Sequence, residues 1–576
     1  MRDYNRAVLS VGNHPAPPGF RLTPTRLVVL SLLPLLAWLP PETRGESMAG
    51  CAALIALVAM VCWNAGIAHA TAQSTLVASI ACAGALSWAS TAPAAAVVPV
   101  SAWLVAAAAG LAAAWSSEDE RLVRAAVWTL VIAAFGVALL ALTQRLWGLE
   151  RWTAIVEQQP DFPDRAAVLT RLGRGRTFAA FATPAALAGY LVMSLPVTLG
   201  LALSREGRVR WLLSGAAVVQ IAALLTAASA TATAALLAAL LFAALVWGRR
   251  GRRLLVAALV PLVLLLAVAW MRSDRLLDLE DAESPWRLRA GNMRAAAAMA
   301  VDHPWIGVGP GGFAERYGSY RRPGDNESRH AHNLPLEFAA EWGWPVGVAL
   351  SALFYSVFLL PLWRERRASR WRRGLALGLA AFALQNLADF TAFMPSLLWS
   401  AALLCGFLQR PSGPAAARST PSSRVLAGAG LTAVLIAAAT SGLSGLAWNA
   451  RNAARAAVFA GEREGALRTA ERSVRLAPWD IDAALLLARL TADAELGRPG
   501  GDADLVVERT EHVVRLSPTR AASRDLRARV RLATGDLPGA YADLAAAARL
   551  HPVHEEYGAA RDRLLSRIAP AGEAER

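Results

Sequence analysis

Residues 303–341 read HPWIGVGPGGFAERYGSYRRPGDNESRHAHNLPLEFAAE, a stretch in which a polar segment rich in Arg and Gly passes into an apolar helix. The polar segment ends in two histidines and an asparagine, and the helix carries two glutamates: His330, His332, Asn333, Glu337 and Glu341. Such groups are costly to place at the mouth of a membrane helix, so they are candidates for function. The stretch therefore indicates a membrane protein and the position of its site.

Apolar segments continue outward from this stretch in both directions. Hydrophobic residues make up 55% of the 576 residues, and the mean hydropathy is +0.38. A membrane-spanning helix needs about 20 apolar residues. The first apolar segment is short, but others follow it at once, which favours an uncleaved anchor over a signal peptide. The sequence predicts an all-α, polytopic bundle of about 12–13 spans, near residues 26–40, 48–66, 72–89, 93–114, 122–147, 179–203, 209–226, 229–247, 253–271, 333–361, 372–391, 393–409 and 425–447.

The distribution of arginine predicts the orientation of the bundle. The chain has no lysine and a formal net charge of +15. Short Arg-rich loops on the cytoplasmic side account for most of this charge, so we expect membrane lipids and no nucleic acid as partners. The six loops that fall on this one side are 2–26, 121–124, 205–210, 249–253, 364–373 and 410–424.

Two long loops, at about 148–178 and 272–332, are then predicted on the outer side. Both are also rich in arginine, including Arg171, Arg174 and Arg176 in the first. Each single arginine is explained by solvated loop charge, which Asp and Glu balance at 272–283. The clusters together favour anion binding, because guanidinium stays ionised and binds phosphate with two hydrogen bonds. A lipid-linked pyrophosphate is an expected partner at this membrane face.

The motifs within 303–341 favour acid–base chemistry. The glycines of 307–312 have no strand-to-helix context for a dinucleotide, and a close backbone turn toward a ligand or the membrane surface is the better interpretation. His330 and His332 are not spaced as a helical zinc pair, although a metal site with Glu337 stays open. One histidine as a general base is favoured over a helix-capping role. Asn333, Glu337 and Glu341 share one helix face, where they orient a histidine or a sugar hydroxyl or line the bundle interior.

The C-terminal tail carries a repeated motif. Arg475-Leu476-Ala477-Pro478, Arg515-Leu516-Ser517-Pro518 and Arg549-Leu550-His551-Pro552 each close an amphipathic stretch, at spacings of 40 and 34 residues. A step of about 34 residues is the period of a tetratricopeptide helix pair, and an ordinary helical bundle is the alternative. Either arrangement predicts a helical module that docks a protein partner or acts as a spacer.

These residues resemble the O-antigen ligase and polymerase superfamily of bacterial membrane glycosyltransferases. The resemblance covers about 120–410. The central motifs of the resemblance are Asp302-His303-Pro304, Gly307 to Phe313, His330-Ala331-His332-Asn333, Leu336-Glu337, Glu341 and Gly343. Upstream, the stretch from Arg176-Thr177-Phe178 to Tyr190 also resembles the family. Downstream, Asn386 to Phe390 and Pro395 do so. Relatives often have Gly where Arg176 stands and Asn-Pro-Asn where Thr183-Pro184-Ala185 stands.

The resemblance implies a GT-C-like helical fold and an inverting transfer that needs no metal or other cofactor. The donor is a glycan on undecaprenyl pyrophosphate, and the acceptor is a lipid, a growing glycan or a protein. The implied base is His332, and an implied pyrophosphate contact is Arg289. The other donor arginine is one of Arg171, Arg174 and Arg176. We expect His330, Asn333, Glu337 and Glu341 to contact substrate.

The predicted organisation has three parts. Residues 1–424 form the membrane glycosyltransferase domain, 425–447 the last span, and 448–576 a periplasmic tetratricopeptide-like domain. The implied location is the bacterial inner membrane, in the synthesis of lipopolysaccharide or another surface polysaccharide. Ligase, polymerase and protein O-oligosaccharyltransferase share this chemistry. A transporter subunit and a membrane-anchored scaffold are more remote alternatives, because polar residues gather at the outer mouth and thirteen spans exceed what an anchor needs.

Overall fold

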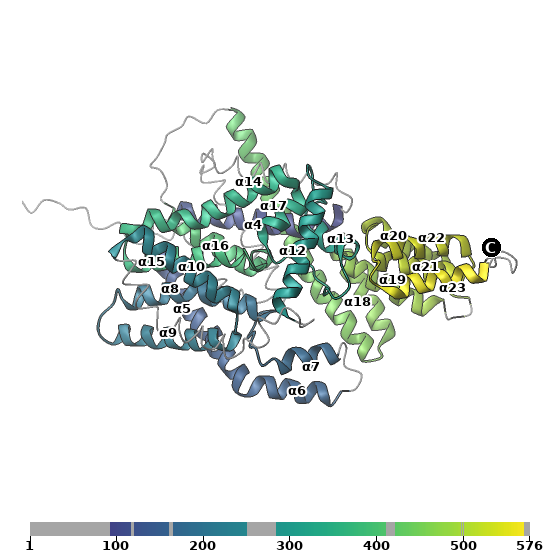
Figure 1. The fold of residues 1–576 in the computed structure, drawn as a ribbon, viewed down its shortest axis with the longest axis horizontal. Coiled ribbons are helices and arrows are strands. Elements are labelled where there is room, and N and C mark those ends of the chain that lie inside the picture. Colours follow the sequence, from purple (N-terminus) through teal and green to yellow (C-terminus); the bar gives the residue numbers. More distant parts are fainter. Residues whose placement is uncertain are drawn as a thin grey trace, which may run out of the picture.

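The computed structural model describes residues 93–568 except 117–119, 160–164, 250–283, 410–420, 497 and 499 (Figure 1). Within these ranges all regular structure is helical and no strand occurs, which confirms the all-α prediction. Four predicted spans, at 26–40, 48–66, 72–89 and 253–271, lie outside the described residues.

Seven of the described helical stretches are long and apolar enough to cross a bilayer, so the chain is a multi-pass membrane protein. One of them continues from α5 through a π-helical turn (Gln144–Gly148) into α6 (Leu149–Glu157). A tight turn at Ala228 and Ser229 separates two other spans, as predicted, with Ala228 in the left-handed region at φ 47°. Each of the seven stretches lies in, or starts in, one of these helices: α4 (Pro93–Ser116), α5 (Glu120–Thr143), α8 (Pro184–Ala202), α9 (Gly207–Ala227), α10 (Ala230–Trp247), α14 (Leu334–Arg364) and α17 (Pro421–Phe459).

Two further predicted spans are shorter than expected. The segments at 372–391 and 393–409 form α15 (Arg370–Gln385) and α16 (Pro395–Leu408), with 16 and 14 residues. Asn386 ends α15 early, because its side chain accepts a hydrogen bond from Ala392 N at 2.7 Å and donates one to the carbonyl of Phe382 at 2.8 Å. The chain then turns through a 3₁₀ segment, η4 (Thr391–Phe393), at the predicted break between the two spans, but the helix before it ends at Gln385 and not at the predicted residue 391.

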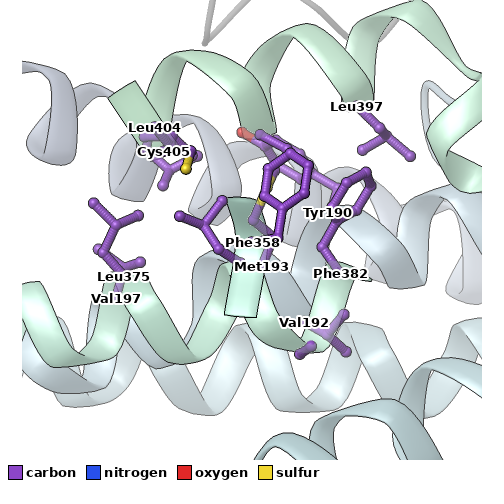
Figure 2. Close-up of a cluster of buried hydrophobic side chains, with 14 of the residues drawn as sticks. Tyr190, Val192, Met193, Val197, Phe358, Leu375, Phe382, Leu397, Leu404 and Cys405 are labelled. Carbon is purple, nitrogen blue, oxygen red and sulfur yellow. The ribbon is translucent and has the colours of Figure 1, made fainter. Parts of the chain in front are cut away.

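The core of the bundle forms around α8, nearly all of which is buried. Figure 2 shows side chains of α8, α14, α15 and α16 meeting there, among them Met193, Phe358, Phe382 and Leu404. The backbones of α8 and α15 come so close that a Cβ on Gly378 would lie 2.0 Å from the carbonyl oxygen of Met193. Small residues at helix contacts are how membrane helices gain dispersion energy without a hydrophobic drive.

Three Arg-rich segments meet at one end of this bundle. Arg370, in the first turn of α15, donates to the carbonyl of Leu203 at the end of α8. The guanidinium of Arg205 lies 5.9 Å from the ring of Trp128 near the start of α5. The far end of α14 reaches the same place through η3 (Glu365–Arg367), whose Glu365 pairs with Arg372 at 2.8 Å. The start of α14, which directly follows the motif His330-Ala331-His332-Asn333, lies at the opposite end of the bundle.

The two predicted outer loops are largely helical. The segment 148–178 folds into a hairpin of α6 and α7 (Arg165–Gly173), at the lower edge of Figure 1. The described part of 272–332 forms α12 (Pro285–Asp302) and α13 (Gly312–Tyr320). Both helices pack against the start of α14, so they are in a position to shape its mouth.

The tail is a row of antiparallel helices in which each packs on the next (Figure 1). The three Arg-Leu-X-Pro motifs end α18, α20 and α22, as predicted. Gly535, at φ 85°, forms the turn before α22 (Leu537–Leu550). The tetratricopeptide assignment itself stays a prediction. The helices are α18 (Arg463–Leu476), α19 (Ile481–Glu495), α20 (Ala503–Leu516), α21 (Ala521–Thr534), α22 (Leu537–Leu550) and α23 (Glu555–Ile568).

Candidate active site

The start of α14 is a short helical piece that is broken at Gly343, which lies at φ 75°. The Gly-rich segment docks on this piece: Val308 N donates to the carbonyl of Ala340 and Gly309 N to that of Glu341, both at 2.9 Å. A Cβ on Gly307 would lie 2.3 Å from the backbone of Glu341. The predicted close turn is therefore present, and the surface it approaches is the backbone of α14.

Polar contacts fix α13 against α12 on the same side of the mouth. The hydroxyl of Tyr317 donates to Asn292 at 2.6 Å, and Arg294 pairs with Asp325 at 2.6 Å. Burial and the negative charge of Asp325 raise the pKa of Tyr317 to about 12, so this hydroxyl stays protonated and remains a donor. These bonds hold the polar segment that leads to the two histidines.

A fully buried carboxylate, Asp389, lies at the centre of the candidate site. Arg289 Nη2 is 3.6 Å from its Oδ2, and His332 Nδ1 is 3.7 Å from its Oδ1. The hydroxyl of Thr231 donates to Oδ2 at 3.0 Å. Burial alone would raise the pKa of Asp389, but His332, Arg289 and the backbone N–H of Phe390 lower it below its usual value. The ionised carboxylate thus joins two residues that lie 43 positions apart in the sequence.

His332 has an unusual backbone conformation. Its φ is 57°, in the left-handed region that a residue with a Cβ seldom adopts. Its ring meets the ring of Phe390 edge-on, with centroids 4.7 Å apart. Its Nδ1 is buried and has no hydrogen-bond partner at the distance observed. Strain of this kind is characteristic of positions where a side chain is held for function.

His330 is held by a different carboxylate. Its Nδ1 lies 2.7 Å from Glu337 Oε1, and the other oxygen of Glu337 accepts from Ala331 N at 2.8 Å. The imidazole stacks on Phe390 and Phe393, with centroids 4.8 and 5.0 Å away. A carboxylate on one ring nitrogen fixes the orientation of the ring.

The remaining two candidates of this motif have mainly structural contacts. The side chain of Asn333 caps α14, because its Oδ1 accepts from Leu336 N at 2.9 Å. Its Nδ2 donates to the carbonyl of Leu387 at 2.8 Å. Glu341 accepts from the backbone N–H of Phe313 at 3.4 Å, which ties α14 to α13. Asn333 thus orients neither histidine directly, because its oxygen caps α14 and its nitrogen binds the carbonyl of Leu387.

Residues 215–351 match the family described as O-antigen ligase. This range contains Arg289, both histidines, Glu337 and Glu341, and it ends within α14. This match supports the resemblance of the chain to the O-antigen ligase and polymerase superfamily. A comparison with curated proteins gives no match. Members of the family include ligases and polymerases, so the match supports a glycosyltransferase with lipid-linked glycan substrates in general.

Arg171, Arg174 and Arg176, which are N-terminal to the matched range 215–351, lie in different surroundings. Arg176 Nε donates to the carbonyl of Ala227 at 3.0 Å, in the turn that leads to Thr231 and so to Asp389. Arg171 donates to the carbonyl of Ala182 and lies over the ring of Phe178. Arg174 lines a separate cavity of about 460 Å³ beside α6. Arg176 is therefore the one whose contacts lead to the Asp389 centre.

A cavity of about 930 Å³ opens beside this centre. Its lining includes His330, Glu337, Glu341 and the rings of Trp103 and Phe393, whereas His332, Arg289 and Asp389 do not line it. The candidate site thus has two adjoining parts: a centre that joins His332 and Arg289 through Asp389, and a cavity onto which the His330–Glu337 pair opens. Phe390 separates the two imidazoles.

Sequence reasoning missed Asp389, Phe390 and Phe393 as site residues. The first two belong to the downstream motif Asn386 to Phe390, which indicated only the family resemblance and no site residue. In the part of the chain that the structure describes, no group of three or more His, Cys, Asp or Glu side chains is arranged to hold a metal ion. The two histidines contact different carboxylates, which argues against their sharing a metal with Glu337.

Proposed function

We propose that this protein is an inverting, metal-independent membrane glycosyltransferase of the O-antigen ligase type. It transfers a glycan from undecaprenyl pyrophosphate to a hydroxyl of an acceptor at the periplasmic face. The observation that carries the proposal is the convergence of His332 and Arg289 on the buried carboxylate of Asp389. This arrangement brings an imidazole and a guanidinium to one carboxylate, and transfer from a pyrophosphate needs a base for the acceptor hydroxyl and a cation for the leaving group.

The reaction begins with proton removal by His332. The imidazole accepts the proton of the acceptor hydroxyl as the oxygen attacks the anomeric carbon of the donor sugar. A new carbon–oxygen bond forms on one face while the bond to the pyrophosphate oxygen breaks on the other, and its electron pair leaves with the pyrophosphate. The configuration at that carbon is inverted. Asp389 stabilises the imidazolium that forms, because it lies 3.7 Å from Nδ1.

Arginines stabilise the leaving group. Arg289 offers a planar guanidinium beside Asp389, held over the ring of Trp286 at 5.4 Å. Of the three upstream candidates we propose Arg176 as the second donor arginine, because its contacts lead to Thr231 and Asp389. Arginine suits this role, since it stays ionised and can bind two phosphate oxygens at once. Arg171 and Arg174 then act outside the reaction centre.

The His330–Glu337 pair holds the acceptor. It lines the cavity and lies across Phe390 from His332, so a sugar hydroxyl there can be oriented toward the base. We further propose the organisation expected from the sequence, with residues 1–424 as the membrane enzyme, 425–447 as the last span and a tetratricopeptide-like periplasmic domain at 448–576. The Arg-rich end formed by Arg205, Arg370 and their neighbours then faces the cytoplasm.

A reconstituted transfer assay tests the proposal. The full-length protein in nanodiscs receives undecaprenyl-pyrophosphate glycan from its own host together with one of three acceptors: lipid A core, host glycan or periplasmic protein. We expect one acceptor to be glycosylated with an inverted linkage, without added divalent metal and in the presence of a chelator. Product with retained configuration, or no product with any of the three acceptors, would contradict the proposal.

A further inference from the structure

The cavity at the mouth of α14 is closed on its far side by the tail. Its lining continues from the membrane helices onto α17, α19, α21 and α23. We call the whole space the interdomain chamber. On the membrane side it is lined by Trp103, His330, Glu337, Glu341 and Phe393, and on the tail side by Trp448, Trp479, Asp482, Arg520, His554 and Tyr557. The tail is therefore placed to contact whatever occupies the cavity.

An ion-pair cluster centred on Asp482 docks the tail at this place. Asp482 pairs with Arg329, directly before His330, at 2.9 Å and with Arg520 at 2.8 Å. Burial alone would raise the pKa of Asp482, but the positive charges of Arg520, Arg329 and Arg451 lower it far below its usual value. The docked tail thus contacts the segment that carries the candidate histidines.

Further contacts join the tail to α13 and to the segment after it. His551 Nε2 lies 3.2 Å from Glu327, and the hydroxyl of Ser319 donates to the carbonyl of Leu550 at 3.0 Å. A Cβ on Gly318 would lie 2.7 Å from the ring of His551. These contacts involve several parts of the tail, so the position of the tail against the membrane helices does not depend on a single ion pair.

The charges of the chamber do not suit a pyrophosphate. Six carboxylates line it against three arginines. Each arginine pairs with an acid of the tail: Arg329 and Arg520 with Asp482, and Arg451 with Asp480 at 2.7 Å. An anionic ligand would meet excess negative charge and arginines that are already engaged. The chamber therefore suits a ligand that is polar and uncharged.

The aromatic rings of the chamber identify the class of such a ligand. Trp479 and Tyr557 belong to different parts of the tail, and the Tyr557 ring stacks on His554 at 4.4 Å. The C–H face of a sugar ring is apolar and packs on aromatic faces, while its hydroxyls donate to carboxylates such as Glu315 and Glu337. A volume of about 930 Å³ lies near the top of the range of about 300–1,000 Å³ for ligand sites. Several sugar residues fit in that space.

We infer that the interdomain chamber binds a carbohydrate chain and that the tail is one wall of this binding site. The inference rests on the proposed glycosyl transfer, because the chain held there is the glycan of the donor or of the acceptor. It changes the expected role of the tail, which binds substrate in addition to any docking of a protein partner.

Binding of free oligosaccharide tests the inference without requiring catalysis. The probe is the oligosaccharide released by mild acid from the lipid-linked pool of the host, added to full-length protein in nanodiscs and observed by saturation-transfer NMR. We expect Trp479→Ala and Tyr557→Ala each to weaken binding about tenfold, equal to about 1.4 kcal/mol. Trp479→Phe, which keeps a ring, should restore most of the binding.

The control is Trp152→Ala, because Trp152 is half exposed on α6 and lies outside the chamber. Transfer kinetics of the same variants distinguish the source of the glycan: a raised KM for the donor assigns the chamber to the donor glycan, and a raised KM for the acceptor assigns it to the acceptor. Binding without any transfer would support the chamber and overturn the proposed function. The inference is overturned if folded Trp479→Ala and Tyr557→Ala proteins bind the oligosaccharide as the unaltered protein does, or if the unaltered protein does not bind it.

Discussion

His332 Nδ1 lies 3.7 Å from Oδ1 of the fully buried Asp389, close enough for charge attraction and too far for a hydrogen bond. The pair is thus poised to tighten when the imidazole gains a proton. The same carboxylate contacts Arg289, so in the proposed mechanism it links the base with the arginine that neutralises the leaving phosphate.

Asp389→Asn tests this link. The amide keeps the shape of the carboxylate but cannot stabilise the imidazolium, so we expect kcat to fall at least about 100-fold, within the usual range for acid–base catalysis. The matched control is Thr231→Val, which keeps the carboxylate, removes the hydroxyl bonds to Asp389 and Ser229, and should change kcat by less than about tenfold. Equal losses in the two variants would indicate a structural role for Asp389.

Arg289→Lys tests the contact to the leaving group. Lysine keeps the positive charge but lacks the planar fork that binds two phosphate oxygens, so we expect a loss of kcat and weaker inhibition by inorganic pyrophosphate. Arg322→Lys is the control, because Arg322 is exposed in the segment after α13. Wild-type kinetics in the Arg289→Lys protein would show that charge alone is sufficient.

Gly343→Ala tests the break in α14. A Cβ there would lie 2.5 Å from the backbone of Trp305 at a φ of 75°, so we expect a loss of stability of about 1–3 kcal/mol and a displaced Gly-rich segment. Gly136→Ala in α5, where a Cβ meets nothing within 4 Å, should be neutral or stabilising. Thermal unfolding of both variants in detergent measures the difference, and similar melting temperatures would contradict a structural need for glycine at 343.

The Asp482 cluster predicts how docking of the tail depends on pH. The pKa of Asp482 is lowered in the folded protein, so its contribution is complete above the unfolded value of about 4 and declines as the pH falls below it. We expect the amide protection factors in segment 312–330, which are corrected for the intrinsic pH dependence of exchange, to be high at pH 7 and lower near pH 3. Asp482→Asn should give fast exchange already at pH 7, and unchanged protection in that variant would show that other contacts dock the tail.

Much of the fold could be predicted from the sequence because bilayer-length apolar segments are a local property. The turn at Ala228 and the helix ends at Leu476, Leu516 and Leu550 were likewise predicted from neighbouring residues. The early end of α15 was not predicted, because it depends on hydrogen bonds of a single buried side chain, Asn386.

The candidate site was predicted only in part, because its centre depends on contacts between distant segments. The stretch 303–341 predicted His330, His332 and Glu337 as site residues, and these three are close together in the sequence. Asp389 meets Arg289 across 100 positions, and no spacing encodes that contact. The tail could be predicted as helical, but its position against Arg329 depends on Asp482, one acid among many in the sequence.

The central claim is that His332 is the base. The most direct test compares kcat of His332→Ala and His330→Ala, each as a folded full-length protein in nanodiscs with saturating donor and acceptor. We predict that His332→Ala loses at least about 100-fold in kcat. His330→Ala should raise the KM for the acceptor and retain most of kcat. An active His332→Ala protein together with an inactive His330→Ala protein would contradict the account and assign the base to the His330–Glu337 pair.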